Sequence, residues 1–185
     1  MAWFSIEKIG TRTELFNKLY RQEISKYTHK IISYSEIYSA LFNSSFPNEP
    51  EKYEICGMPR NDLLYSRNSE LLKDIFGEEV INKKVIAYLP TYRQWEFDMI
   101  INGDRNWENL FGFSKFDLEE FANFLRNNNY FFFCKLHHME YNQLDLDIYT
   151  KYSDVICILE EKKLEDLEID LYEILSSIDM LITDY

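Results

Sequence analysis

Two clusters of polar residues in the first half of the sequence follow apolar runs and could carry chemistry. The first holds Arg60, Asn61 and Asp62 behind a Gly-Met-Pro turn, and could present a guanidinium, an amide and a carboxylate together. A structural turn with a surface ion pair is the alternative interpretation. In the second, Thr91 and Arg93 follow a run of five apolar residues and Pro, so a hydroxyl and a bidentate donor could hold a phosphate there.

Two further clusters lie in the second half. Lys135 and His137 end a Phe-rich run, where a cation and an imidazole could neutralise a diphosphate or protonate a leaving group. His138 follows directly, and neighbouring residues of a strand point to opposite faces, so we expect one histidine in a given site. Asp184 follows an apolar run at the end of the sequence and could contact a ligand, with a frayed terminus as the alternative. We expect no metal and no cofactor.

The elements that position these clusters follow from apolar spacing and capping residues. Continuous apolar runs predict strands, and helical spacing behind Thr, Ser, Asn or Asp predicts capped helices. The expected strands are 30–34, 52–56, 85–89, 130–136, 155–159 and 180–183. The expected helices are 11–29, 35–42, 68–76, 117–125 and 171–177, and the stretch 91–113 is expected to be a long loop.

Alternation of strands and helices predicts an α/β fold with parallel sheets. In such sheets ligands bind beyond the carboxyl ends of the strands, where all four polar clusters fall. The step at Asn82-Lys83-Lys84, before the most apolar strand, is the expected domain boundary, which gives domains 1–82 and 83–185.

The composition limits the class of partner. With 46% hydrophobic residues in 185, the chain can form a packed core, and its formal net charge of -12 opposes unaided binding to nucleic acid or anionic lipid. Any anionic substrate therefore needs a local basic pocket. We expect no signal peptide and no membrane-spanning segment, and hence a cytoplasmic protein with at most peripheral membrane contact. Three dispersed cysteines, Cys56, Cys134 and Cys157, are expected to be buried free thiols.

The four clusters, in this order, resemble the motifs of the CDP-glycerol glycerophosphotransferase family, which includes teichoic-acid polymerases and primases. The family's Gly-x-Pro-Arg-Asn-Asp is matched by 57–62, and its Pro-Thr-aromatic-Arg by 90–93. Its Lys-Leu-His-Pro is matched by 135–138, with His138 in place of Pro. Its Leu-Ile-Thr-Asp-Tyr, preceded by an Asp-Leu-Tyr helix, is matched by 170–175 and 181–185.

This resemblance implies a two-lobed GT-B transferase with Rossmann-like sheets. Residues 1–82 would be the end of the acceptor-side lobe and residues 83–185 the start of the nucleotide-binding lobe. The implied reaction moves glycerol phosphate from CDP-glycerol to a polyol-phosphate chain of teichoic acid or a capsule, releasing CMP. His137 would be catalytic and, with Arg93, would serve the diphosphate. Asp184 would lie near the nucleotide, and Arg60, Asn61, Asp62, Thr91 and Lys135 would bind substrate.

Two departures bear on activity. The family's Trp-His-Gly, whose histidine looks like the catalytic base, aligns without a gap with Met1, Ala2 and Trp3, and with a gap its histidine aligns with Phe4. The family's Ser-Ser after Thr-Asp-Tyr is also missing. We therefore expect a fragment that is inactive by itself, with an unpaired sheet edge that promotes self-association. A non-catalytic nucleotide-binding or interaction remnant and a GT-B enzyme that uses a sugar nucleotide are the alternatives.

Overall fold

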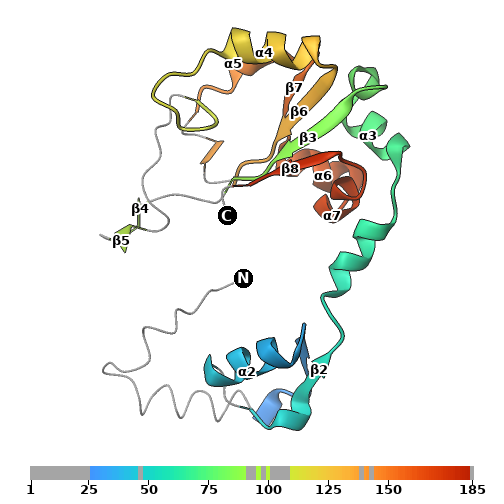
Figure 1. Ribbon diagram of the computed structural model, residues 1–185, viewed down its shortest axis with the longest axis vertical. Coiled ribbons are helices and arrows are strands. Elements are labelled where there is room, and N and C mark those ends of the chain that lie inside the picture. The colour runs from blue at the N-terminus through green and yellow to red at the C-terminus, as the bar shows by residue number, and fades with distance from the viewer. Residues whose placement is uncertain are drawn as a thin grey trace. The chain divides into compact units, whose positions relative to one another are not determined.

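The computed structural model describes residues 26–45, 48–90, 95–96, 99–100, 109–137, 140–141 and 144–183. They belong to two compact units, which divide between Asp62 and Leu63. Both units contain parallel strands and helices, so the expected α/β class is confirmed (Figure 1). Among the described residues, no helix is long and apolar enough to cross a bilayer.

The first unit is built on two short parallel strands. Strand β1 (Ile31–Ser33) pairs with β2 (Tyr53–Ile55), and helix α2 (Glu36–Ser45) lies between them in sequence. The predicted cap is present, because the Ser35 hydroxyl accepts a hydrogen bond from the backbone N–H of Tyr38 at 3.3 Å. The 3-10 helix η2 (Pro50–Lys52) leads into β2. The pairing of β1 with β2 confirms both strands predicted for this unit.

The second unit has a four-stranded parallel sheet in the order β7-β6-β3-β8. Its strands are β3 (Lys84–Tyr88), β6 (Tyr130–Cys134), β7 (Ile156–Ile158) and β8 (Met180–Ile182). Its helices are α3 (Ser69–Phe76), α4 (Leu118–Asn127), α5 (Asp147–Thr150), α6 (Glu161–Leu167) and α7 (Leu171–Leu175). The shorter elements are η3 (Pro59–Tyr65), which spans the division between the units, η4 (Glu78–Val80), and the antiparallel pair β4 (Trp95–Glu96) and β5 (Met99–Ile100).

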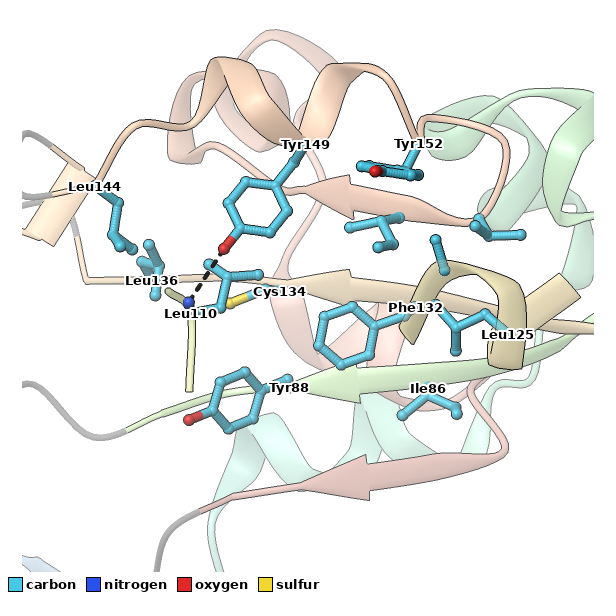
Figure 2. Packing of buried hydrophobic residues seen from close by; sticks show 13 residues of the cluster. Ile86, Tyr88, Leu110, Leu125, Phe132, Cys134, Leu136, Leu144, Tyr149 and Tyr152 are labelled. Carbon is cyan, nitrogen blue, oxygen red and sulfur yellow. Dashed lines mark hydrogen bonds between the residues drawn. The ribbon is translucent and has the colours of Figure 1, made fainter. Parts of the chain in front are cut away.

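Both faces of this sheet are covered, because alternate strand residues point to opposite sides. In β3, Val85 and Ala87 join one apolar cluster, with residues of α3, α6 and α7, while Ile86 and Tyr88 join another, with residues of α4 and α5. Figure 1 shows these helices in two layers on either side of the sheet. Figure 2 shows the second cluster, where Phe132 of β6 packs beside Tyr88 and Leu125. The prediction of a strand buried on both faces is confirmed.

Side-chain caps fix where three helices of the second unit begin. Asn68 accepts hydrogen bonds from two N–H groups of α3, and Gly77, with φ of 81°, ends that helix in a backbone conformation that favours glycine. Asp117 caps α4 and Asp170 caps α7 through their carboxylates. These caps confirm the predicted starts of the three helices.

The structure also differs from the sequence-based expectations. The expected helix 11–29 lies mostly outside the described residues. Helices α5 and α6 were not predicted, and β4 and β5 lie within the stretch expected to be a loop. Cys56 is exposed, which corrects the expectation of a buried thiol, because it follows the short β2 instead of lying within a covered strand. All three cysteines are free.

Candidate functional site

The four strands of the parallel sheet in the second unit end at the same level. In the sheet register Ile158 lies opposite Cys134, Cys134 opposite Tyr88, and Tyr88 opposite Ile182. These four residues end β7, β6, β3 and β8, respectively. The segments that leave the strands therefore start side by side along one edge of the sheet, as expected for a ligand site of an open parallel sheet.

Backbone hydrogen bonds continue across this edge beyond the strands. The N–H of Leu89 donates to the carbonyl of Ile182 at 2.9 Å, and the N–H of Lys135 donates to the carbonyl of Tyr88 at 3.1 Å. The N–H of Leu159 donates to the carbonyl of Cys134 at 2.8 Å. The first residue after each of these three strands is therefore held in place by a neighbouring strand.

Among the described residues that directly follow these four strands, Lys135 is the charged one. Its ammonium forms an ion pair with the carboxylate of Glu161, the first residue of α6. The Lys135 side chain is only 16% exposed, whereas that of Glu161 is 54% exposed. Lys135 thus lies at the carboxyl edge of the sheet, with a carboxylate partner that sequence reasoning missed, and its binding of phosphate stays a prediction.

His137 lies two residues beyond Lys135, and its side chain is exposed. Its carbonyl accepts a hydrogen bond from the N–H of Glu140 at 2.8 Å, and its N–H donates to a carboxylate oxygen of Glu140 at 3.4 Å. Glu140 is only 1% exposed, which makes it a buried acid beside the predicted catalytic residue. Sequence reasoning missed Glu140 as well.

Tyr141, the residue after Glu140, is tied to the segment that follows β7. The Tyr141 hydroxyl donates to the carbonyl of Leu159 at 2.7 Å. Burial, as the largest cause, raises the pKa of Tyr141, so the hydroxyl keeps its proton and its hydrogen bond at neutral pH. The segments that carry Lys135, His137 and Glu161 are therefore joined through hydrogen bonds to one another as well as through the sheet.

The predicted Arg60, Asn61 and Asp62 belong to the first unit and lie within η3, beyond the end of β2. All three side chains are exposed. Gly57 precedes them with φ of 74°, a conformation that favours glycine, and the N–H of Asn61 donates to the carbonyl of Met58 at 2.9 Å. The predicted Gly-Met-Pro turn is present, and the binding role of the three side chains stays a prediction.

Three of the predicted site residues, Thr91, Arg93 and Asp184, lie outside the described residues. His138, the neighbour of His137, does so too. Their assignments stay predictions. Among the described residues, no group of three or more His, Cys, Asp or Glu side chains could hold a metal ion.

A hollow of about 500 Å³ lies beside the sheet in the second unit. Its polar lining comes mainly from three carboxylates, with two ammonium groups on α6: Asp74, Glu160, Asp166, Lys162 and Lys163. Because carboxylates outnumber cations, this hollow does not attract a diphosphate. The strand-end edge with Lys135 is the better candidate for an anionic ligand.

Comparison with known proteins identifies the family. The family model described as CDP-Glycerol:Poly(glycerophosphate) glycerophosphotransferase matches residues 4–185. This chain belongs to that family. The resemblance carried by the four sequence motifs is thereby confirmed.

The names of the relatives of this chain refer to teichoic acid synthesis. A teichoic acid poly(glycerol phosphate) polymerase of Staphylococcus epidermidis is 29% identical over 95% of this chain, and a teichoic acid glycerol-phosphate primase of Bacillus subtilis is 25% identical over 98% of it. The solved structure of the wall teichoic acid polymerase TagF matches 99% of the chain with a TM-score of 0.64 at 26% identity.

This chain spans only part of the length of each of these proteins. It covers 22% of the staphylococcal polymerase, 42% of the primase and 41% of the solved TagF chain. The likeness to TagF confirms the parallel, Rossmann-like α/β fold expected of a GT-B-type transferase.

Proposed function

We propose that this chain is part of a transferase that moves glycerol phosphate from CDP-glycerol to the polyol-phosphate chain of a teichoic acid or related capsule polymer. Membership of the glycerophosphotransferase family and the names of its relatives support the reaction class. The observation that carries the site is the common level of the four strand ends, with Lys135 at their edge.

In this proposal the strand-end edge of the second unit holds the donor. Lys135 and Arg93 offset the charge of the diphosphate, and Thr91 adds a hydroxyl donor to a phosphate oxygen. Asp184 lies near the nucleotide. His137 acts at the diphosphate, where an imidazole can protonate the departing phosphate oxygen near neutral pH.

The proposed reaction is a displacement at phosphorus. A hydroxyl oxygen of the acceptor chain attacks the phosphorus that bears glycerol, and the bond from this phosphorus to the bridging oxygen of the diphosphate breaks. The bridging oxygen keeps the electron pair and leaves as part of CMP, so its new charge must be neutralised by cations or a proton. The acceptor hydroxyl loses its proton to a base, which the family resemblance assigns to the histidine of Trp-His-Gly.

That histidine has no counterpart in the residues of this chain. Residues 1–4, where the motif would align, hold Met, Ala, Trp and Phe. We therefore propose that these 185 residues supply donor binding and leaving-group chemistry, and that they bind CDP-glycerol without turnover by themselves.

We further propose that the two parts of the chain serve different substrates. Arg60, Asn61 and Asp62 would face the acceptor side, and residues 83–185 the nucleotide. The compact units divide earlier, between Asp62 and Leu63, because the apolar face of α3 packs into the same cluster as Val85 and Phe131. The enzyme would work in the cytoplasm, in peripheral contact with the inner face of the plasma membrane, where a polymer chain on a lipid would be extended.

Isothermal titration of the full chain with CDP-glycerol tests this function. We expect saturable binding that weakens at least tenfold in Lys135→Ala, a loss of about 1.4 kcal/mol or more. UDP-sugars should not compete. Preferential binding of a UDP-sugar would favour the sugar-nucleotide alternative, and binding of neither ligand would sink the proposed function.

A non-catalytic remnant is the second candidate, favoured by the missing Trp-His-Gly histidine. A longer in-frame protein that carries this motif separates the two. Release of CMP by that protein, lost in its His137→Ala variant, supports a working transferase. Binding without release of CMP in the longer protein supports the remnant.

A further inference from the structure

Lys135 and Glu161 form a charge pair at the edge where the strands end. Lys135 follows β6 and Glu161 begins α6, which follows β7. The N–H of Leu159 donates to the carbonyl of Cys134, which links the chain just before Glu161 to the chain just before Lys135. The two charges therefore face each other from backbone segments whose separation is fixed by the sheet.

We propose that Glu161 masks the charge of Lys135 and thereby sets the affinity of this edge for diphosphate groups. The inference rests on the proposed function, in which Lys135 contacts the donor's diphosphate. In the structure the Glu161 carboxylate pairs with the Lys135 ammonium. A diphosphate must displace this carboxylate before it can bind.

The side chains of Lys135 and Glu161 are buried to different extents. This difference indicates that Glu161 masks the charge of Lys135 and does not hold Lys135 in position. The Lys135 side chain is 16% exposed and its N–H is held by the carbonyl of Tyr88, so the position of Lys135 does not depend on Glu161. Glu161 is 54% exposed, so its carboxylate can turn into solvent and stay hydrated when it is released. The Lys135 ammonium, on a side chain that is only 16% exposed, is then open to a new anionic partner, which a diphosphate supplies.

The net charge of the whole chain gives a reason for Glu161 to mask Lys135. With a net charge of -12, the chain repels small anions in general, and a lysine without a carboxylate partner would attract any phosphate to the strand ends. A carboxylate on that lysine imposes the same cost of displacement on every anion. Masking therefore lowers the affinity of this edge for all anions alike. A ligand that makes further contacts can still bind, whereas the binding of free phosphate, which relies on the lysine, becomes very weak.

Glu161→Gln in the full chain tests the proposal, because it removes the charge and keeps the length of the side chain. Glu165→Gln is the matched control, since Glu165 is an exposed acid on the same helix and the substitution changes the net charge equally. In titrations with inorganic pyrophosphate we expect binding about three- to tenfold tighter in Glu161→Gln, and less than twofold tighter in Glu165→Gln. The double variant Lys135→Ala, Glu161→Gln should lose the gain. Equal effects of the two glutamine variants, or weaker binding in Glu161→Gln, would overturn the masking role.

Two further readouts separate this inference from the proposed function. Without any ligand, mass spectrometry should find Lys135 acetylated faster by acetic anhydride in Glu161→Gln than in the parent chain; an unchanged rate would count against masking. If Glu161→Gln binds pyrophosphate more tightly but no form binds CDP-glycerol, masking stands and the proposed function fails. If the parent chain binds CDP-glycerol and Glu161→Gln binds it no more tightly, the function stands and masking fails. If no form binds either ligand, both fail.

Discussion

The hydroxyl of Tyr149 accepts a hydrogen bond from the backbone N–H of Leu110 at 3.1 Å, and both residues are buried (Figure 2). Burial raises the pKa of Tyr149, so the neutral hydroxyl is the form that makes this contact. The bond joins α5, which follows β6, to the segment that leads into α4. The hydrogen bond thus links α5 to the segment before α4 on one face of the sheet.

Removal of this hydroxyl should destabilise the second unit. In Tyr149→Phe the buried N–H of Leu110 loses its acceptor, which costs about 1–3 kcal/mol. Chemical denaturation checks this, with Tyr130→Phe as the control, because Tyr130 is half-buried at the edge of the same cluster. Equal stability of the two variants would show that the hydrogen bond contributes nothing.

Arg126 and Asp154 form a bidentate ion pair with both N–O distances at 2.7 Å. The hydrogen bonds from Arg126 hold the pKa of Asp154 below its ordinary value of 3.8. A carboxyl whose pKa is lowered by folding stabilises the fold above its ordinary pKa, and this contribution is lost as pH falls through the folded value. Because both side chains are about 40% exposed, Asp154→Asn should cost only about 0.5–1 kcal/mol at pH 7.

The pH dependence of that cost is the sharper measurement. The stability difference between the parent chain and Asp154→Asn should shrink below pH 3.8 and in high salt. Glu119→Gln serves as the control, since Glu119 makes only a 3.9 Å, largely exposed pair with Lys151. A difference that stays constant down to pH 2 would contradict the assigned role of the charge.

Thiol accessibility differs among the three cysteines. Cys56 is exposed, Cys134 is buried, and burial raises the pKa of Cys157. Because the thiolate is the reactive form, iodoacetamide should alkylate Cys56 first and Cys134 only on unfolding. Peptide mapping by mass spectrometry under native conditions measures the order, and early labelling of Cys134 would contradict the described core.

Strand β8 is an edge strand in the described sheet, and its three apolar residues are between 39% and 50% exposed. Such an edge is a template for pairing with another chain. We predict concentration-dependent self-association of the isolated chain, reduced by Leu181→Lys in sedimentation velocity. Leu167→Lys on the exposed part of α6 is the control. A monomer at all concentrations, or equal effects of both lysines, would sink this prediction.

The sheet could be predicted from sequence because its signals are local. Val85 to Tyr88 and Phe131 to Cys134 are apolar at every position, which is typical of strands covered on both faces. Asn68, Asp117 and Asp170 marked helix starts through their capping oxygens. Placement of Lys135 and His137 at the carboxyl edge followed from these elements alone.

The partners of these residues could not be predicted in the same way. Helix α6 is seven residues long, with Glu160 at its N-cap position and no side-chain capping bond, so it carries no start signal. Without α6, nothing in the sequence connects Glu161 to Lys135. The division between the two units could not be predicted from the sequence either. It depends on how α3 packs against Val85 and Phe131 and not on a change in composition.

Amide chemical-shift mapping of the isotope-labelled chain with CDP-glycerol tests the central claim most directly. The proposed site predicts that the largest saturable shifts fall on residues 135–141, beyond the end of β6, and on Leu159 and Glu161, beyond the end of β7. Lys135→Ala should raise the CDP-glycerol concentration needed to saturate them at least tenfold. Shifts confined to the hollow beside Asp74 and Asp166, or to the first unit, would contradict a donor site at the strand ends.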